Sequence, residues 1–437
     1  MDLCKMVRTL PRRLPNDRLL QCSSAAATKR LHAHTLTLLY QVVGPSHIDH
    51  LLDSLDSNTF VKHFLLGNNI IGPRGARRIA RFVDEHPNQM ETWYLAGNCI
   101  DASSFHVLSQ AFVNSSAITN VWLKRNPLTS AAAQDMFELV TKAPSLRTLD
   151  FDQTSFGDAG LSQLFEKLAN HDESVSLRNI YMNGNGMSKS GATQLARYLA
   201  SPHCQLESLY TSVNPLGNAG VEALAVGLAK NTSLQRLSME SVGMSGAGAN
   251  ALFEVLAQHP TIRALNVGTA YQTGDLGGRF NYLVDDAAHS LCELIFTSRS
   301  LCYLDLGYTA LSAERYIDIM RAVGGSSTDL VYFSARPGST DLSRPANYRK
   351  MLEGDISIRK SQVFGRLLAN VRAAYGHDWT YQRFQREQQR FMMSPPDVRL
   401  IDSVYRNRDA GLARRGLKWL EKEWEEGDET LKGVMEA

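Results

Sequence analysis

The strongest constraint on the fold is an internal repeat with a near-constant period of about 28 residues. Each copy has the form a–x–x–a–x–a–x–x–N–x–a, where a is apolar, x is any residue and N is asparagine in the best copies. Eleven copies begin at residues 33, 61, 90, 118, 146, 177, 206, 234, 262, 301 and 330, the last incomplete. Only the step from residue 262 to residue 301 departs strongly from the period. Such a period is typical of a solenoid, in which each unit stacks on its neighbours.

Each copy contains two hydrophobic periods. The a–x–a core alternates with period two, which predicts a short strand with one buried face. A glycine-rich turn follows, such as "GPRG" from residue 72, and then apolar residues recur at helical spacing, as at Leu161, Leu164 and Leu168. The sequence therefore predicts an α/β fold: a right-handed β-α solenoid of about 11 repeats, with parallel strands inside a curve and helices outside.

The asparagine of the repeat has a predicted structural role. Its amide both donates and accepts, so it can bond to backbone groups where the strand bends into the turn. Gln41, Thr154 and Thr309 could partly replace it, whereas Val242 and Ala270 could not, so we expect the ladder to be weakest at these two. The predicted ladder consists of Asn69, Asn98, Asn126, Asn185 and Asn214.

The unit resembles the ribonuclease-inhibitor-like class of leucine-rich repeat proteins in its period, its asparagine position and its helical outer side. The resemblance covers residues 33–340 and implies a horseshoe-shaped leucine-rich repeat domain. It is specific for the fold but not for function, because the class includes inhibitors, a GTPase activator and immune receptors.

The flanking regions differ in charge from the repeat. Residues 1–32 hold seven basic and two acidic residues, and we expect a disordered basic arm; a mitochondrial presequence is the alternative, against which two prolines and two aspartates count. Residues 341–437 hold 18 basic and 15 acidic residues and no repeat. Their apolar and arginine pattern predicts a helical extension that caps the last repeat.

Composition favours a soluble monomer in a reducing compartment. No apolar run is long enough to span a membrane, and the six cysteines show no metal-binding or disulfide spacing. We therefore expect a cytoplasmic protein, with the nucleus as an alternative compartment.

The residue between the two apolar positions of each strand is predicted to point to the open concave face. Down the copies this position holds Thr37, Leu65, Tyr94, Trp122, Asp150, Tyr181, Tyr210, Ser238, Asn266, Asp305 and Ser334. Tyrosine and tryptophan are enriched at binding hot spots, so the aromatic cluster in the middle copies favours a protein partner. The predicted partner-binding residues are Tyr94, Trp122, Lys124, Arg125, Asp150, Asp152, Tyr181 and Tyr210. The alternative is that aromatic residues merely suit strands.

The copy with the longest step supplies a second candidate contact. Its additional residues fall between Gly268 and Asp286, at the rim of the predicted concave face. Long loops of this kind are either functional or neutral insertions. The candidate rim residues are Tyr271, Asp275, Arg279, Phe280 and Tyr282.

No catalytic, nucleotide-binding or metal-binding motif occurs, so we expect no enzyme activity, cofactor or metal. The predicted function is a protein-interaction scaffold or inhibitor that binds its partner on the concave face. One alternative is a GTPase-activating protein of the Ran-activator type, with Arg125 as the charge-neutralising residue; the short acidic end of this chain departs from that pattern. The other is nucleic-acid binding through the arginine- and aromatic-rich segment near Trp379.

Overall fold

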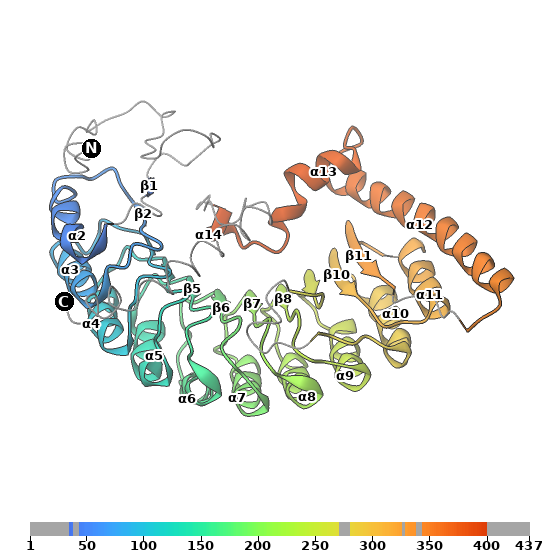
Figure 1. Ribbon diagram of the computed structural model, residues 1–437, viewed down its shortest axis with the longest axis horizontal. Helices are drawn as coiled ribbons and strands as arrows, with labels where there is room; N and C mark the ends of the chain where they lie inside the picture. Colours follow the sequence, from blue (N-terminus) through green and yellow to red (C-terminus); the bar gives the residue numbers. More distant parts are fainter. Residues whose placement is uncertain (1–34, 38–42, 271–279, 326–327, 338–342, 400–437) are drawn as a thin grey trace. The chain divides into compact units, whose positions relative to one another are not determined.

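The computed structural model describes residues 35–37, 43–270, 280–325, 328–337 and 343–399 (Figure 1). The chain divides into two compact units. The first holds the described residues up to Ser155 together with residues 396–399, and the second holds Phe156–Pro395. The boundary expected at residue 340 lies inside the second unit.

The first unit alternates parallel strands with helices in chain order. Its elements are β1 (Thr35–Thr37), α2 (Gly44–Asp53), β2 (His63–Leu65), α3 (Gly72–Glu85), β3 (Thr92–Tyr94), α4 (Ala102–Val113), β4 (Asn120–Trp122), η1 (Ser130–Ala132), α5 (Ala133–Lys142), β5 (Thr148–Asp150) and the short α14 (Pro396–Arg399). Each of the strands β1 to β5 pairs in parallel with the next.

The second unit continues the alternation and ends in helices. Its repeat elements are α6 (Gly157–Ala169), β6 (Asn179–Tyr181), α7 (Lys189–Leu199), β7 (Ser208–Tyr210), α8 (Gly217–Leu228), β8 (Arg236–Ser238), α9 (Gly246–Ala257), β9 (Ala264–Asn266), η2 (Asp285–Ala287), α10 (Ala288–Thr297), β10 (Tyr303–Tyr308), α11 (Ala313–Gly324) and β11 (Tyr332–Arg336). The strands β6 to β11 again pair in parallel with their chain neighbours. The predicted open β-α solenoid is thus confirmed.

The strand registers confirm the alignment of the repeats. Trp122 lies opposite Tyr94 on one side and Asp150 on the other. Tyr181 lies opposite Tyr210, which lies opposite Ser238. The same position of successive copies therefore forms one row along each unit.

Strands β10 and β11 are longer than the others, and their register shifts between Asp305 and Gly307. Gly307 has a φ of 59°, and a Cβ atom there would lie 2.7 Å from the Cα atom of Gly268. Only glycine fits this bend, because both the backbone conformation and the close approach exclude a side chain.

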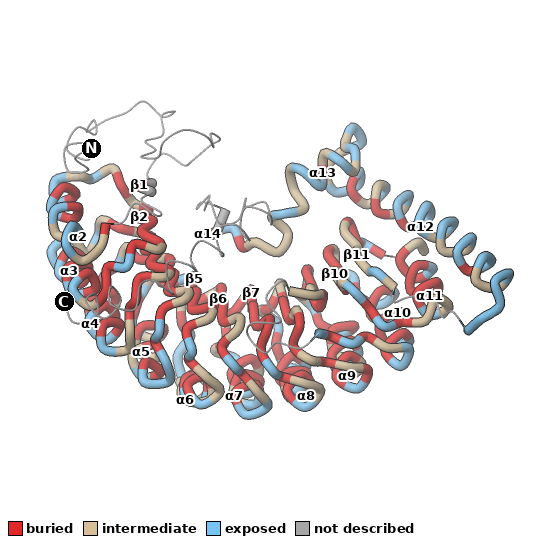
Figure 2. Tube along the Cα trace, in the orientation of Figure 1, coloured by how far each residue is buried: buried red, intermediate tan, exposed pale blue. Residues whose placement is uncertain are grey.

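The core of each unit lies between the strands and the helices (Figure 2). Leu161, Leu164 and Phe165 of α6 are fully buried there, as their spacing predicts. Their helix begins at Gly157, so "GDAG" forms its first turn rather than a separate loop. Across the part of the chain that the structure describes, no helix is both long and apolar enough to cross a membrane.

The repeat asparagines bond to the backbone where each strand ends. The Asn126 amide nitrogen donates to the carbonyls of Leu95 and Leu123, at 2.9 and 2.8 Å. Its oxygen accepts from the backbone N–H groups of Asn98 and Ile100, at 2.9 and 3.0 Å. One side chain therefore joins two consecutive copies through four hydrogen bonds, all of them buried. Related bonds involve Asn69, Asn98, Asn185 and Asn214.

The ladder is not interrupted at the long copy, so the expected weakness at Ala270 is wrong. The oxygen of Asn281 accepts from the N–H groups of Val242 and Met244, at 3.0 and 3.3 Å. Its nitrogen donates to the carbonyls of Met239 and Val267, both at 2.8 Å. Asn281, and not Ala270, therefore fills the ladder position of this copy. The additional residues precede that position and leave the ladder intact.

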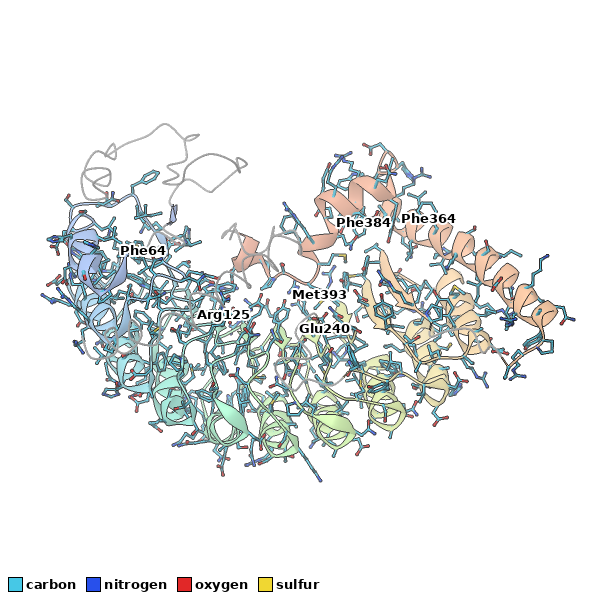
Figure 3. The ribbon with its side chains drawn as sticks, viewed as in Figure 1. Phe64, Arg125, Glu240, Phe364, Phe384 and Met393 are labelled. Atoms are coloured by element: carbon cyan, nitrogen blue, oxygen red, sulfur yellow. The ribbon has the colours of Figure 1, made fainter. Side chains whose placement is uncertain are left out.

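The C-terminal helices pack on the last repeat of the second unit. They are α12 (Ala346–Tyr375), α13 (Tyr381–Glu387) and the 3-10 turn η3 (Gln389–Phe391). Val371 and Phe384 form a buried cluster with Val331, the residue before β11. Ile358 and Phe364 lie at helical spacing with the buried Leu367 and Val371 in the sequence, but they are 59% and 51% exposed. Phe364 is labelled on α12 in Figure 3. The terminal segment "LKWLEKEWEE" lies outside the described residues.

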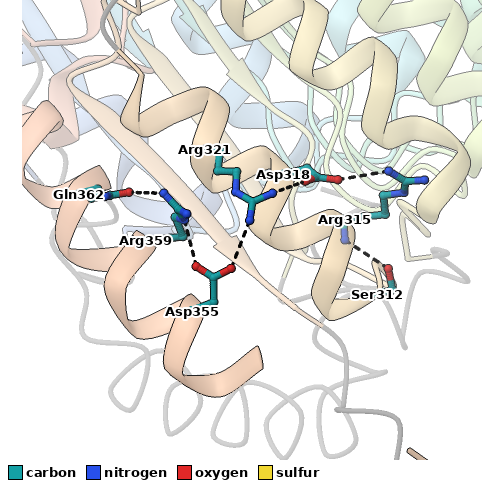
Figure 4. A network of polar contacts seen from close by, with 7 residues as sticks. All are labelled: Ser312, Arg315, Asp318, Arg321, Asp355, Arg359 and Gln362. Carbon is teal, nitrogen blue, oxygen red and sulfur yellow. Dashed lines mark hydrogen bonds and ion pairs between the residues drawn. The ribbon is translucent and has the colours of Figure 1, made fainter. Parts of the chain in front are cut away.

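Ion pairs also connect α11 with α12 (Figure 4). The Asp355 carboxylate accepts from Arg321 at 3.2 Å and from Arg359 at 3.1 Å. Arg321 also reaches Asp318 on its own helix, at 3.1 Å. These groups are partly exposed, so the apolar cluster at Phe384 contributes more to the docking of the cap than the ion pairs do.

Candidate protein-interaction surface

The predicted binding residues of the first unit lie in one group on β3, β4 and β5. The rings of Tyr94 and Trp122 have centroids 5.8 Å apart. The Lys124 ammonium lies 3.4 Å from the Asp152 carboxylate, and Asp150 accepts a hydrogen bond from the backbone N–H of Asp152 at 2.9 Å. The structure therefore brings together an aromatic pair and an ion pair on adjacent strands.

Arg125 lies beside this group, in the turn after β4. Its backbone has a φ of 59°, and its guanidinium reaches the side-chain oxygen of Asn68 at 3.5 Å (Figure 3). Arg125 is half-buried, and Asn68 belongs to the turn after β2, two repeats earlier in the chain. This geometry holds Arg125 in the turn and does not by itself favour a role in neutralising phosphate charge.

The predicted binding residues of the second unit form a tight aromatic stack. The rings of Tyr181 and Tyr210 are parallel, with centroids 4.0 Å apart and an interplanar angle of 1°. Ser238 and Asn266 continue the row on β8 and β9. Farther along this face, Tyr303 stacks on Tyr332 at 4.4 Å.

Polar groups lie at the strand ends beside the second row. Burial raises the pKa of the Glu240 carboxyl; a hydrogen bond with Asn266 opposes the shift, and the like charge of Asp305 adds to it. Burial also raises the pKa of Asp305, and a hydrogen bond from the backbone N–H of Gly307 partly offsets this upward shift. The carboxyl groups of Glu240 and Asp305 are therefore both protonated more readily than an exposed acid.

The expectation that the aromatic residues stand open to solvent is wrong. Trp122 is only 5% exposed, and Tyr210 is 7% exposed. In the second unit, part of the cover is visible among the described residues: the hydroxyl of Tyr210 donates to the backbone carbonyl of Met393, which follows η3. The Arg236 side chain at the start of β8 donates to the carbonyl of Met392 at 3.0 Å. Sequence reasoning missed both contacts, since nothing local in "RFMMSPP" indicates where it packs.

The candidate rim residues are only partly described. Phe280 and Tyr282 are 48% and 52% exposed on either side of Asn281. The other three, Tyr271, Asp275 and Arg279, lie outside the described residues. Two exposed aromatic side chains therefore flank Asn281, which hydrogen bonds to the backbone hold in place.

One group of side chains has ligand types that a metal could use. Oxygen or nitrogen atoms of Asp56, Glu85 and His86 lie within 4.8 Å of one another. All three are partly or fully exposed, and His86 already pairs with Asp56 at 3.4 Å. Two surface carboxylates and one histidine without a buried donor do not define a metal site.

Similar proteins were found by sequence, although no family profile matches the chain. The pig ribonuclease inhibitor is 25% identical over 302 residues, which cover 63% of this chain and 58% of the inhibitor. The mouse NACHT, LRR and PYD domains-containing protein 3 is 25% identical over 296 residues, covering 60% of this chain and 27% of that protein. Among solved structures, the leucine-rich repeat-containing protein LegL7 of Legionella pneumophila aligns with 76% of this chain and 97% of its own, with a TM-score of 0.42 and 16% identity.

The repeat pattern, the parallel β-α units and the asparagine ladder define a leucine-rich repeat protein. The sequence relatives support the resemblance of these repeats to the ribonuclease-inhibitor-like class. The chain spans a little over half the length of the ribonuclease inhibitors that it matches.

Proposed function

We propose that this chain is a non-catalytic protein-interaction module that binds another protein on the strand face of its repeats. The observation that carries the proposal is the alignment of aromatic residues at one register position: Tyr94 with Trp122 in the first unit, and Tyr181 with Tyr210 in the second. The fold needs no aromatic residue at this position, because the buried spine is formed by the neighbouring apolar positions.

The chemistry of this face suits a protein surface. Large rings with a polar tip combine apolar contact with a hydrogen-bonding group, and such residues dominate binding hot spots. The ion pair of Lys124 and Asp152 adds a polar edge of the kind found around such hot spots. A protein as the class of partner is also in keeping with the relatives, one of which is named as an inhibitor of ribonuclease.

The two alternative functions have no specific support among the described contacts. The Arg125 guanidinium donates to Asn68, in the turn after β2. In the segment proposed for nucleic-acid binding, Phe384 is fully buried, and Arg383 is paired with Asp378 at 3.3 Å and with Glu387 at 3.1 Å. Aromatic rings used in packing are not available for stacking on bases.

Affinity capture with the full chain tests the proposal. A Trp122→Ala/Tyr181→Ala variant removes one ring from each row, and Val226→Ala is the matched control because Val226 is 68% exposed on helix α8. A ring at a hot spot contributes about 2 kcal/mol, so we expect each bound protein to lose about 30-fold or more in affinity with the double variant. Circular dichroism confirms that the variants fold. Equal binding by all three proteins would reject the site.

A further inference from the structure

The segment after α13 lies across the strand face of the second unit. The carbonyl of Met392 accepts from Arg236, and the carbonyl of Met393 accepts from the Tyr210 hydroxyl. The partners are 156 and 183 residues apart in sequence, so these are tertiary contacts and not turns. Figure 3 places Met393 on the same side of the sheet as Glu240.

Side-chain packing accompanies the two hydrogen bonds. Met392 packs against the cluster of Val331, Val371 and Phe384, and Pro395 is buried. Tyr181 stacks directly on Tyr210, so a segment bound to Tyr210 also limits access to Tyr181. The candidate binding row of the second unit is therefore covered by the chain itself.

The contacts have the chemistry of peptide recognition. Both donors belong to the strand face, and both acceptors are main-chain carbonyls of consecutive residues. Recognition through main-chain carbonyls tolerates different side chains, while apolar contacts such as those of Met392 add specificity. An unbranched thioether adapts to irregular apolar surfaces, which suits a segment that binds and leaves.

The anchor of the segment does not depend on the hydrogen bonds to Arg236 and Tyr210. Phe384 is fully buried, and the Tyr381 hydroxyl donates to the Val331 carbonyl at 3.2 Å. Helix α13 can thus stay in place while the residues after it leave the strand face, because its own packing is separate from the bonds to Arg236 and Tyr210.

We propose that residues 390–395 are an internal ligand of the second unit: they occupy a surface that binds the main-chain carbonyls of a peptide turn with apolar side chains, and a protein partner displaces them. This inference rests on the proposed function and specifies its ligand. The surface is defined by Tyr181, Tyr210 and Arg236.

Footprinting of the full chain with hydroxyl radicals tests the cover. A Met392→Glu/Met393→Glu variant puts a charge in place of the apolar contact between Met392 and the cluster of Val331, Val371 and Phe384, so the segment should leave the face. Labelling of Tyr181 and Tyr210 should then rise several-fold, while the 60% exposed Tyr308 serves as an internal reference. Met351→Glu, at a 58% exposed position of α12, is the matched control and should change nothing. Unchanged protection of Tyr210 in the first variant would overturn the proposal.

Binding of a synthetic peptide with the sequence of residues 389–395 tests the surface. The peptide should bind the Met392→Glu/Met393→Glu variant at least about tenfold more tightly than wild type, in which the site is occupied. Adding Tyr210→Phe and Arg236→Met to that variant should remove this gain, because both donors to the carbonyls are lost. Equal binding to the released variant and to wild type contradicts an internal ligand.

The two proposals fail in different ways. If protein capture needs Tyr181 but footprinting shows no cover, the proposed function stands and the internal ligand does not. If the peptide binds the released variant but neither wild type nor the released variant captures a protein, the surface stands and the proposed function does not.

Discussion

The rings of Tyr181 and Tyr210 lie parallel with their centroids 4.0 Å apart, and the hydroxyl of Tyr210 donates to the carbonyl of Met393. Three segments that are distant in the chain therefore meet at one stack. The stack contains both tyrosines of the predicted surface in the second unit and the hydrogen bond that covers them. Substitutions can therefore separate the contribution of ring stacking to stability from that of the hydrogen bond.

A double-mutant cycle measures the stack. Tyr181→Ala and Tyr210→Ala should each lower the free energy of unfolding, and the coupling between them should be about 0.5–1.5 kcal/mol, as for other aromatic pairs. Tyr210→Phe keeps the ring and loses the hydroxyl that bonds to Met393, so it should cost about 1 kcal/mol. Chemical denaturation of the full chain gives these values. A coupling of zero would mean that the stacked geometry does not contribute.

Asn281→Ala should be among the most destabilising single substitutions on the strand side. It leaves the N–H groups of Val242 and Met244 without their acceptor inside the protein, and each buried unsatisfied group costs about 1–3 kcal/mol. Asn114→Ala is the control, because this exposed asparagine bonds within its own helix. The loss should exceed about 2 kcal/mol for Asn281→Ala and stay within about 0.5 kcal/mol for Asn114→Ala. Similar losses would show that the amide is not essential to the ladder.

The prediction for the cap separates packing from charge. Phe384→Ala removes a fully buried ring and should cost about 3–5 kcal/mol. Asp355→Asn breaks partly exposed ion pairs with Arg321 and Arg359 and should cost less than about 1 kcal/mol, and less still at high salt. Thermal unfolding at two ionic strengths gives both results. A larger effect for Asp355→Asn would mean that the ion pairs dominate the docking of α12.

Stability should decrease in mild acid because of His259. This side chain is 5% exposed, and burial lowers its pKa to about 4. The unfolded chain binds a proton near pH 6.5 while the folded chain does not, so stability is lost as the pH falls from about 6.5 to about 4. His259→Asn keeps an acceptor for the N–H of Thr261 and removes this dependence. Unfolding free energies measured between pH 4 and pH 7 check it. An identical pH slope in the variant would exclude His259 as the source.

The spine of the fold could be predicted from the sequence because it repeats. Period-two alternation fixes which strand residues face the core, and a register error would expose a whole row of apolar side chains. The observed pairing of Tyr94 with Trp122 and of Tyr181 with Tyr210 follows from that constraint. Because eleven copies can be aligned with one another, a single irregular copy does not change the assignment of the strand positions.

Asn281 was missed although a signal was present. The residues Asn281 and Leu283 preserve the N–x–a end of the repeat, but they stand after the insertion, whereas constant spacing points to Ala270. An alignment that lets the insertion fall before the asparagine would have found it. The rule that the ladder residue must fill its backbone site is stronger than the rule of constant spacing.

The cover of the strand face could not be predicted in the same way. The contacts of Met392 and Met393 occur once, join segments that are far apart in the chain and use backbone carbonyls, which every residue has. The spacing of apolar residues in the sequence therefore does not indicate these contacts. The bond from Tyr210 to Met393 is part of this cover, so sequence reasoning placed the row correctly and its solvent exposure wrongly.

The position of Asn281 also has a consequence for how such a protein can change. Because the bonds to Val242 and Val267 are made after the additional residues, the chain between Gly268 and Phe280 can be lengthened, shortened or replaced while the stacking of coils is kept. New recognition sequences can thus be inserted between Gly268 and Phe280 at little cost to folding.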